Sequence, residues 1–482
     1  MLKITIIGGG PGGYSATFAA AKAGMEVTLI EKTRLGGTCL NTGCIPTKSL
    51  KATADALETV QSLQSYGINL SEQAIASVDM PKVIERKDKI RSILEGGLIK
   101  ACAKHKVNYY AGSAKILNAK QVEVEISEDK IIVDSDVIII ATGSTVRELP
   151  SLPFDGEHII HSDHMLDRMN LPKKMIIVGG GVVGCEMAFI YQSFGVSVTL
   201  VEGQKRLLPI PGVDVEMSTL LQREMKKKKI AVYLGSTLGN VVVGKGKVQA
   251  QIEPLVMAGE EVNPKSKVIA IESDVVLVTV GRSPCTQNLG LESVGINVNA
   301  QGWIEVDEHL RTNIPNVYAI GDVLGPNYIM LAHMAAAEGI HAVRHIIKNG
   351  SDAESKLAPM DYSIVPSAIF TSPEIACVGL SEEQAREQGI NVQTASFLMR
   401  ELGKAQASGH LAGVIKLVSN ADNGKLLGAH MAGEHCSDLI AEAALCMRMG
   451  GSVQDIANTI HAHPTLAEGV FEAACGLYGA EF

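Results

Sequence analysis

One strand–turn–helix–strand pattern occurs twice in the 482 residues and limits the fold more than any other feature. In the first copy a short β-branched run leads into the glycine-rich turn Gly8–Gly13, a helical stretch follows, and a second strand ends at Glu31. The second copy has the same parts 171 residues later, with its turn at Gly179–Gly184 and its acid at Glu202. This pattern is typical of the dinucleotide-binding fold. The sequence therefore predicts an α/β chain with two Rossmann-like domains.

The glycine spacing has a chemical reason in each copy. A G-x-G-x-x-G turn lets the backbone turn tightly and approach a pyrophosphate at a helix N-terminus, and an acid about 20 residues further on accepts hydrogen bonds from a ribose. The motif is weak alone and strong within a strand–helix–strand unit. The candidate residues are Gly8, Gly10, Gly13 and Glu31 in the first copy and Gly179, Gly181, Gly184 and Glu202 in the second. The chain then has two dinucleotide sites, or one site and one degenerate copy.

Two cysteines, Cys39 and Cys44, follow the first glycine turn. On a regular helix their Cα atoms would lie about 8–9 Å apart, whereas a disulfide requires less than about 7 Å. A bridge therefore needs an irregular turn, which Asn41, Gly43 and Pro46 allow. A strained, accessible bridge is easily reduced, as a catalytic disulfide must be. The alternative is a pair of independent packing thiols.

Composition excludes several classes of protein. A net charge of −9 without a basic stripe argues against a nucleic-acid partner. Nine cysteines scattered over so long a chain indicate reduced thiols rather than a disulfide scaffold. No apolar run approaches the roughly 18 residues of a membrane span, and Met1 leads directly into a strand, without a signal peptide. We expect a cytoplasmic protein that does not bind membranes.

Outside the two nucleotide units the sequence predicts helices over Thr47–Val60 and Lys82–Lys104. The apolar residues Ile90, Ile93, Leu94 and Leu98 mark one face of the second helix. The last part of the chain, from Tyr362 onward, mixes strands with helices and has no nucleotide turn, so an α+β domain is expected there. Cys436, with two histidines nearby, fits no zinc spacing and is interpreted as a packing thiol.

Six separate motifs together resemble those of the flavin-dependent pyridine nucleotide–disulfide oxidoreductases, over essentially the whole chain. They are Gly8–Gly13, Cys39–Lys48, Ala141–Ser144, Gly179–Glu202, Ala319–Asp322 and His463–Glu468. Within the family the chain is most similar to the dihydrolipoamide dehydrogenase branch. The resemblance implies a homodimer and two cofactors, FAD and NAD. It also implies four domains: an FAD-binding domain (1–150), an NAD-binding domain (151–280), a central segment returning to the FAD site (281–350) and a C-terminal dimerisation domain (351–482).

The resemblance assigns roles to individual residues. Cys39 would exchange with substrate and Cys44 would face the flavin, while Lys48 and Glu186 would form an ion pair near the flavin N5. His463 would be the base, because a thiolate rather than a thiol attacks a disulfide and its proton must be taken up. Its orienting partner would be Glu468, and the His463–Pro464 bond is expected to be cis. The further cofactor-binding positions are Gly112, Thr142, Gly143, Gly281, Asp322 and Ala332.

The function implied by the resemblance is oxidation of a protein-bound dihydrolipoyl group or a small dithiol, with electrons passing through the Cys39–Cys44 disulfide and FAD to NAD. The protein partner would be a lipoyl-bearing component of a 2-oxoacid dehydrogenase or glycine cleavage complex. Glu202 favours NAD because a carboxylate repels a 2′-phosphate, although Lys205 and Arg206 lie nearby in sequence. The alternatives are a glutathione-type disulfide reductase, a mercuric reductase and a non-catalytic flavoprotein subunit.

Overall fold

The structure is a computed structural model that describes residues 1–69, 71, 76–255, 267–349 and 357–478. The chain divides into two compact units. Unit 1 comprises Met1–Leu50, Asp79–Arg147 and Gly281–Tyr362. Unit 2 comprises Lys51–Val78, Glu148–Val280 and Ser363–Phe482. Each unit contains one of the two nucleotide folds expected from the sequence.

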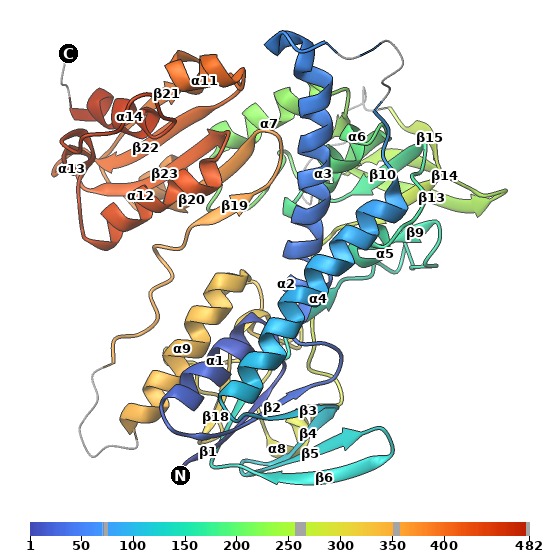
Figure 1. Ribbon diagram of the computed structural model, residues 1–482, viewed down its shortest axis with the longest axis vertical. Helices are drawn as coiled ribbons and strands as arrows, with labels where there is room; N and C mark the ends of the chain where they lie inside the picture. The colour runs from blue at the N-terminus through green and yellow to red at the C-terminus, as the bar shows by residue number, and fades with distance from the viewer. Residues whose placement is uncertain (70, 72–75, 256–266, 350–356, 479–482) are drawn as a thin grey trace. The chain divides into compact units, whose positions relative to one another are not determined.

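Unit 1 is built on a parallel sheet with the strand order β18-β7-β1-β2-β3. Its strands are β1 (Lys3–Ile7), β2 (Glu26–Glu31), β3 (Asn108–Ala111), β7 (Val137–Ile140) and β18 (Val317–Ala319). The central strands are almost entirely apolar because both faces of such a sheet are covered. Helices α1 (Pro11–Lys22) and α9 (Ala332–Asn349) lie side by side (Figure 1). They approach so closely that a Cβ on Gly339 would lie 2.5 Å from the carbonyl oxygen of Gly12.

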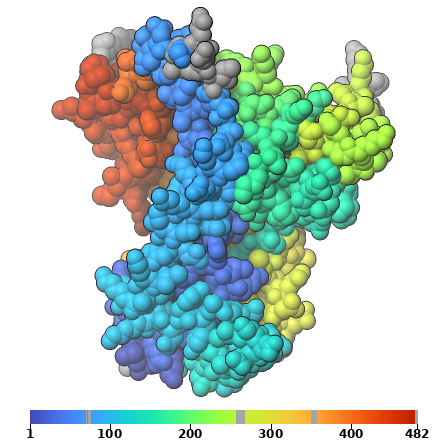
Figure 2. All heavy atoms as spheres, turned by 45° about the vertical axis from the view of Figure 1, so that its right-hand side comes forward, coloured from blue at the N-terminus to red at the C-terminus, as the bar shows by residue number. Residues whose placement is uncertain are grey.

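Smaller elements surround this sheet. An antiparallel meander, the strands β4 to β6, lies at the surface of unit 1 (Figure 2). The two strands β8 and β17 pair antiparallel where the chain returns to unit 1. The bounds of the elements of unit 1 are β4 (Ser113–Asn118), β5 (Gln121–Ile126), β6 (Asp129–Asp134), β8 (Ser144–Val146), β17 (Arg282–Pro284), α2 (Gly37–Asn41), α4 (Met80–Lys104), α8 (Leu291–Val294) and the 3₁₀ helix η2 (Gly321–Leu324). Helix α3 (Cys44–Ser62) begins in unit 1 and belongs to unit 2 from Lys51 onward.

The two predicted helices outside the nucleotide folds are present as α3 and α4, and the apolar face predicted for α4 is only partly buried, with Leu98 packed against the core of unit 1. Ile93 is 64% exposed and Leu94 is 43% exposed. The helix is instead buried through other positions, namely Met80, Val83, Ile84, Lys87 and Cys102. Periodicity located the helix correctly, but four apolar residues within nine positions do not say which side of it meets the core.

The nucleotide sheet of unit 2 has the order β12-β11-β10-β16-β9 and is also parallel. Its strands are β9 (Ile159–Ile160), β10 (Lys174–Val178), β11 (Ser197–Val201), β12 (Ala231–Tyr233) and β16 (Val275–Val278), with helices α5 (Ser162–Leu166), α6 (Val182–Ser193) and α7 (Val215–Lys227). An antiparallel sheet follows, made of β13 (Ser236–Gly244), β14 (Lys247–Pro254) and β15 (Ile269–Ser273). The duplication extends to strand register: Lys3 pairs with Glu26 in unit 1, and Lys174 pairs with Ser197 here.

The C-terminal part of unit 2 is an antiparallel sheet with the order β19-β20-β23-β22-β21, covered by helices, as the α+β prediction required. Its elements are β19 (Ser367–Ile369), β20 (Glu374–Gly379), α10 (Glu382–Glu387), β21 (Val392–Leu398), α11 (Gly403–Ser408), β22 (Val414–Asn420), β23 (Leu426–Gly433), α12 (Cys436–Arg448), α13 (Val453–Ala457) and α14 (Glu468–Tyr478). Cys436 is fully buried in its core, consistent with a packing thiol.

Candidate functional site

The first and last glycines of each predicted triplet stand where no side chain fits, whereas a Cβ on Gly10 or Gly181 would meet no close contact. A Cβ on Gly8 would lie 2.2 Å from the carbonyl oxygen of Ala141, and one on Gly13 would lie 1.8 Å from that of Gly8. The second turn repeats this, because a Cβ on Gly184 would lie 1.9 Å from the carbonyl oxygen of Gly179. Gly8 and Gly179 also share a φ of +108°, which glycine adopts readily. Each turn therefore presents bare backbone at a helix N-terminus, as phosphate binding requires.

Backbone amides hold both predicted acids in the same way. The Glu31 carboxylate accepts hydrogen bonds from the amides of Gly9 (2.7 Å) and Thr33 (2.8 Å). The Glu202 carboxylate accepts from the amides of Gly180 and Gln204. A carboxylate has about four acceptor positions, so each acid keeps capacity for ribose hydroxyls while its orientation is already set. The predicted cofactor residue Gly112 lies beside the first acid, and its amide donates to the Glu31 carbonyl at 2.9 Å.

The remaining FAD-site candidates of unit 1 gather at the ends of the same parallel strands. Thr142 and Gly143 follow β7, and the Thr142 hydroxyl is buried without a hydrogen-bond partner among the described residues. Asp322 follows β18, accepts from the Ser144 hydroxyl at 2.7 Å, and lies in the same unit as Ala332 at the start of α9. An orphaned hydroxyl beside a glycine cradle is what a bound dinucleotide would satisfy. These residues fit FAD.

The two cysteines lie on either side of a helix break. Cys39 is in α2, and Cys44 is the first residue of α3. Thr42 interrupts the helix with φ −138° and ψ 15°. The Asn41 amide secures the preceding loop by donating to the carbonyls of Leu35 (3.1 Å) and Gly37 (3.0 Å). The irregular turn that a bridge would need is therefore present. Neither thiol is in a disulfide in the structure, and the redox disulfide stays a prediction.

The groups around the two thiols have opposing effects on the pKa of Cys39. A hydrogen bond with Cys44 raises the pKa of Cys39, and burial raises it further, while the charge of Lys48 acts in the opposite direction. Tyr14 of α1 is close enough for both thiols to raise the pKa of its phenol, after burial, which is the main cause. A thiol pair with shared protons and a nearby cation is suited to thiol–disulfide exchange.

The predicted base lies in unit 2 beside its predicted partner. Nδ1 of His463 is 2.8 Å from a Glu468 carboxylate oxygen, and the other oxygen accepts from the Thr465 amide at 2.8 Å. That amide, followed by the His463 hydrogen bond, lowers the pKa of Glu468. Because the carboxylate accepts from Nδ1–H, Nε2 keeps its lone pair and can take a proton. The His463–Pro464 peptide is cis, as expected.

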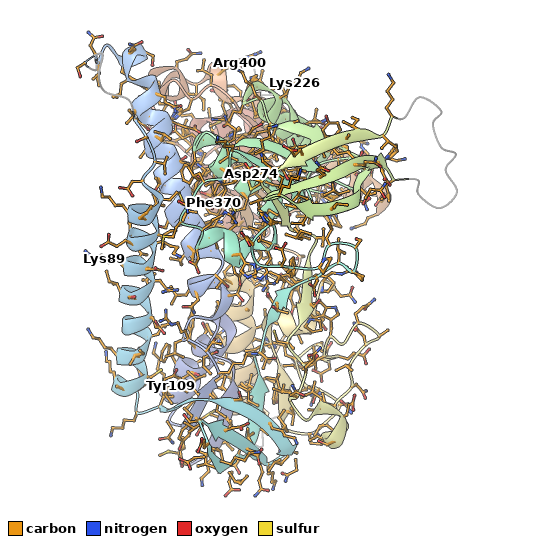
Figure 3. All side chains as sticks on the ribbon, turned by 90° about the vertical axis from the view of Figure 1, so that its right-hand side faces the viewer. Lys89, Tyr109, Lys226, Asp274, Phe370 and Arg400 are labelled. Carbon is orange, nitrogen blue, oxygen red and sulfur yellow. The ribbon has the colours of Figure 1, made fainter. Side chains whose placement is uncertain are left out.

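One predicted pair of site residues is divided between the two units. Glu186 is buried on α6 of unit 2, where it accepts at 2.9 Å from the amide of Phe370, the residue labelled in Figure 3. Its predicted ion pair with Lys48 of unit 1 stays a prediction. Gly281, a predicted cofactor-binding position, belongs to unit 1, where its carbonyl oxygen accepts from the Arg147 amide at 3.1 Å.

Sequence reasoning missed Arg282, whose guanidinium donates to the hydroxyl and carbonyl of Ser144 and lies 3.7 Å from Asp322. It also missed Glu338 of α9, which accepts from the Gly321 amide at 2.6 Å and from the Tyr362 hydroxyl at 2.9 Å. The only sequence signal for Arg282 was its place as a basic residue after a buried strand. Glu338 had no sequence signal, because its contacts join segments that are distant from one another in sequence.

Comparison with known proteins decides the family. The chain matches the pyridine nucleotide-disulphide oxidoreductase family over residues 2–339 and the dimerisation domain of that family over residues 365–474. This chain belongs to the pyridine nucleotide-disulphide oxidoreductase family. It is 38% identical to the mitochondrial dihydrolipoyl dehydrogenase of Dictyostelium discoideum, covering 98% of this chain and 94% of that protein. It is 37% identical to the dihydrolipoyl dehydrogenase of Bacillus subtilis, covering 99% of each.

Solved structures agree with this assignment. The crystal structure of LpdA from Mycobacterium tuberculosis superposes with a TM-score of 0.88 at 25% identity, covering 99% of this chain and 100% of that one. The predicted fold class, the identity as a flavoprotein oxidoreductase, and the cofactors FAD and NAD are confirmed. The matched dimerisation domain indicates a homodimer. No helix within the described ranges is long and apolar enough to cross a membrane. The cytoplasmic location and the four domain boundaries stay predictions.

Proposed function

We propose that this oxidoreductase converts dihydrolipoyl groups to lipoyl disulfides and reduces NAD. The arrangement of His463 is the observation that carries the proposal: Glu468 holds Nδ1 and the imidazole is 77% exposed, so Nε2 is presented outward as a base for a thiol substrate. The curated relatives are dihydrolipoyl dehydrogenases over nearly their whole length. A non-catalytic flavoprotein would need neither this pair nor the two thiols.

The chemistry of the residues follows from their contacts. In the oxidised enzyme, His463 takes a proton from the substrate dithiol, and the resulting thiolate attacks Sγ of Cys39, so that a mixed disulfide forms and the Cys39–Cys44 bond breaks. The second substrate thiol, once deprotonated, attacks its own sulfur in the mixed disulfide and releases Cys39. The substrate leaves as a cyclic disulfide, and the enzyme has gained two electrons as two thiols. Bound FAD supplies the acceptor for this electron pair, with NAD as the final oxidant.

The choice of nicotinamide cofactor rests on two residues of unit 2. Glu202 is fixed beside the second glycine turn, where its charge would repel a 2′-phosphate. Lys205 and Arg206 were the competing signals in the sequence, and the contacts of Arg206 are defined. Its guanidinium donates to the carbonyls of Val213 (2.8 Å) and Ile210 (3.1 Å) and to the Ser218 hydroxyl (3.0 Å), so it is occupied by its own loop. These contacts favour NAD.

The homodimer gives the base and the thiols a way to meet. We infer that His463 of one subunit acts on the cysteines of the other, since a two-fold interface creates two equivalent shared sites. The 351–482 domain would then supply the base, the 1–150 domain the thiols, the 151–280 domain the NAD site and the 281–350 segment part of the FAD site. A lipoyl-bearing protein of a multienzyme complex is the proposed partner.

Steady-state turnover tests the proposal. We expect NADH formation from dihydrolipoamide with NAD, and much slower turnover when NADP replaces NAD. Glutathione disulfide with either reduced nicotinamide is the comparison. Rapid reduction of glutathione disulfide, with no oxidation of dihydrolipoamide, would refute the proposed function and favour the glutathione-type alternative.

A further inference from the structure

A second histidine, His461, lies in the loop that carries the base. Residues 458–467 join α13 to α14 and contain both imidazoles. The side chain of His461 is 7% exposed, whereas that of His463 is 77% exposed. Two residues of the same type, two positions apart, are therefore kept in opposite environments. The mechanism above uses only the exposed one.

The hydrogen bonds of the two rings differ as much as their exposure. Nδ1 of His461 is 2.8 Å from the Thr459 carbonyl oxygen, and Nε2 is 2.8 Å from a carboxylate oxygen of Glu442 on α12. Both ring nitrogens are therefore in contact with oxygens of the loop and of α12. Neither nitrogen of His461 is open to a substrate. His463 uses only Nδ1, which explains why it is the histidine able to act as the base.

The buried ring also connects three parts of the fold. Besides Glu442 on α12 and Thr459 at the start of the loop, it packs on Phe471 of α14, with ring centroids 5.5 Å apart. Its neighbour Ile460 is 97% exposed. A hydrogen bond to a carboxylate is stronger than one between neutral groups, so the contact with Glu442 ties the loop to α12.

We propose that His461 and Glu442 form a hydrogen-bonded clamp that positions the loop carrying the His463 base. The inference deepens the proposed function, because it concerns the base of that same reaction. His461 is a positioning residue, since it meets the reaction only through the loop. A base displaced by about 1 Å can cost roughly 100-fold in rate. The clamp should therefore affect the dithiol reaction and leave the nicotinamide reaction unchanged.

The test uses the holoenzyme with the variants H461Q, E442Q and the double variant. We expect kcat/KM for dihydrolipoamide to fall roughly 10- to 100-fold in each single variant. The double variant should be no less active than the less active single variant, because H461Q and E442Q remove the same interaction. Single-turnover reduction of the enzyme by NADH, which needs no base, should stay within about twofold of wild type. H410Q is the matched control: it breaks another histidine–glutamate pair of unit 2, between His410 and Glu434, which includes neither residue of the clamp.

The outcomes are distinct. Wild-type kcat/KM in both H461Q and E442Q would overturn the clamp, and so would an equal loss in the NADH reaction, which would indicate general damage. A fall in H410Q as large as in E442Q would also overturn it. Absence of dihydrolipoamide oxidation in the wild type would instead refute the proposed function.

Discussion

Glu338 gives the most quantitative prediction, because it is a carboxylate 1% exposed beneath the FAD-site turn at Gly321 and Asp322. Burial, with a smaller contribution from Asp322, raises its pKa from 4.5 to about 7, against the lowering effect of the Gly321 amide and the Tyr362 hydroxyl. Between pH 4.5 and 7 the folded protein therefore holds a proton that the unfolded chain has released. The free energy of unfolding must fall as pH rises through that window.

The size of the effect follows from the shift. At 1.36 kcal/mol per pKa unit, the rise from 4.5 to about 7 corresponds to about 3 kcal/mol lost by pH 8. Glu338→Gln keeps the shape and removes the titration, because the amide carbonyl can accept from Gly321 and the amide nitrogen can donate to Tyr362. We expect the variant to gain up to about 3 kcal/mol relative to wild type between pH 5 and pH 8.

Denaturant unfolding of FAD-loaded wild type and E338Q, compared at equal subunit concentration across pH, measures this difference. Infrared difference spectra of the two proteins should show the protonated carboxyl band of Glu338 disappearing near neutral pH. Tyr362→Phe removes one donor to the carboxylate and should move the transition to higher pH. A stability difference between E338Q and wild type that stays constant from pH 4.5 to 8 would refute the reasoning.

Three further predictions concern the catalytic residues. Cys39→Ser should retain a long-wavelength thiolate–flavin absorption near neutral pH and Cys44→Ser should lose it; persistence of the band in both variants contradicts the assignment. Glu202→Ala should lower kcat/KM with NAD roughly 10- to 100-fold, the value of a charged hydrogen-bond acceptor, and should improve the ratio of NADP to NAD use; an unchanged ratio means that the acid does not select the cofactor. Mixing Cys39→Ser with His463→Ala subunits should restore about a quarter of wild-type activity, because random pairing makes half the dimers mixed, each with one intact site. Verified mixed dimers without activity would place the base in its own chain.

The parts of the fold that the sequence predicted well are those set by local rules. Gly8 and Gly179 meet a neighbouring carbonyl at distances no side chain tolerates, so the glycine pattern alone located both turns. The break between Cys39 and Cys44 was likewise expected from turn-forming residues around Asn41. Such constraints depend on a few adjacent residues and do not change with the rest of the fold.

The parts that were missed depend on contacts between distant segments. The side of α4 that meets the core could not be predicted from its apolar residues, because α4 is buried through Val83 and Ile84 while Ile93 is exposed. The resemblance assigned the base to His463, but nothing in the sequence indicated that His461 is held, since its partner Glu442 lies on another helix. Contacts between distant segments determine which imidazole is buried and which is exposed.

The strand order of unit 1 has a consequence for how the chain is made. Strand β18 pairs with β7, but more than 170 residues of chain, including the whole nucleotide sheet of unit 2, separate the two strands in sequence. On the ribosome, the unit 2 sheet can therefore close once residue 278 has emerged, while β7 waits as an unpaired edge until Val317–Ala319 follows. Of the two nucleotide folds, the one begun first during synthesis is completed second.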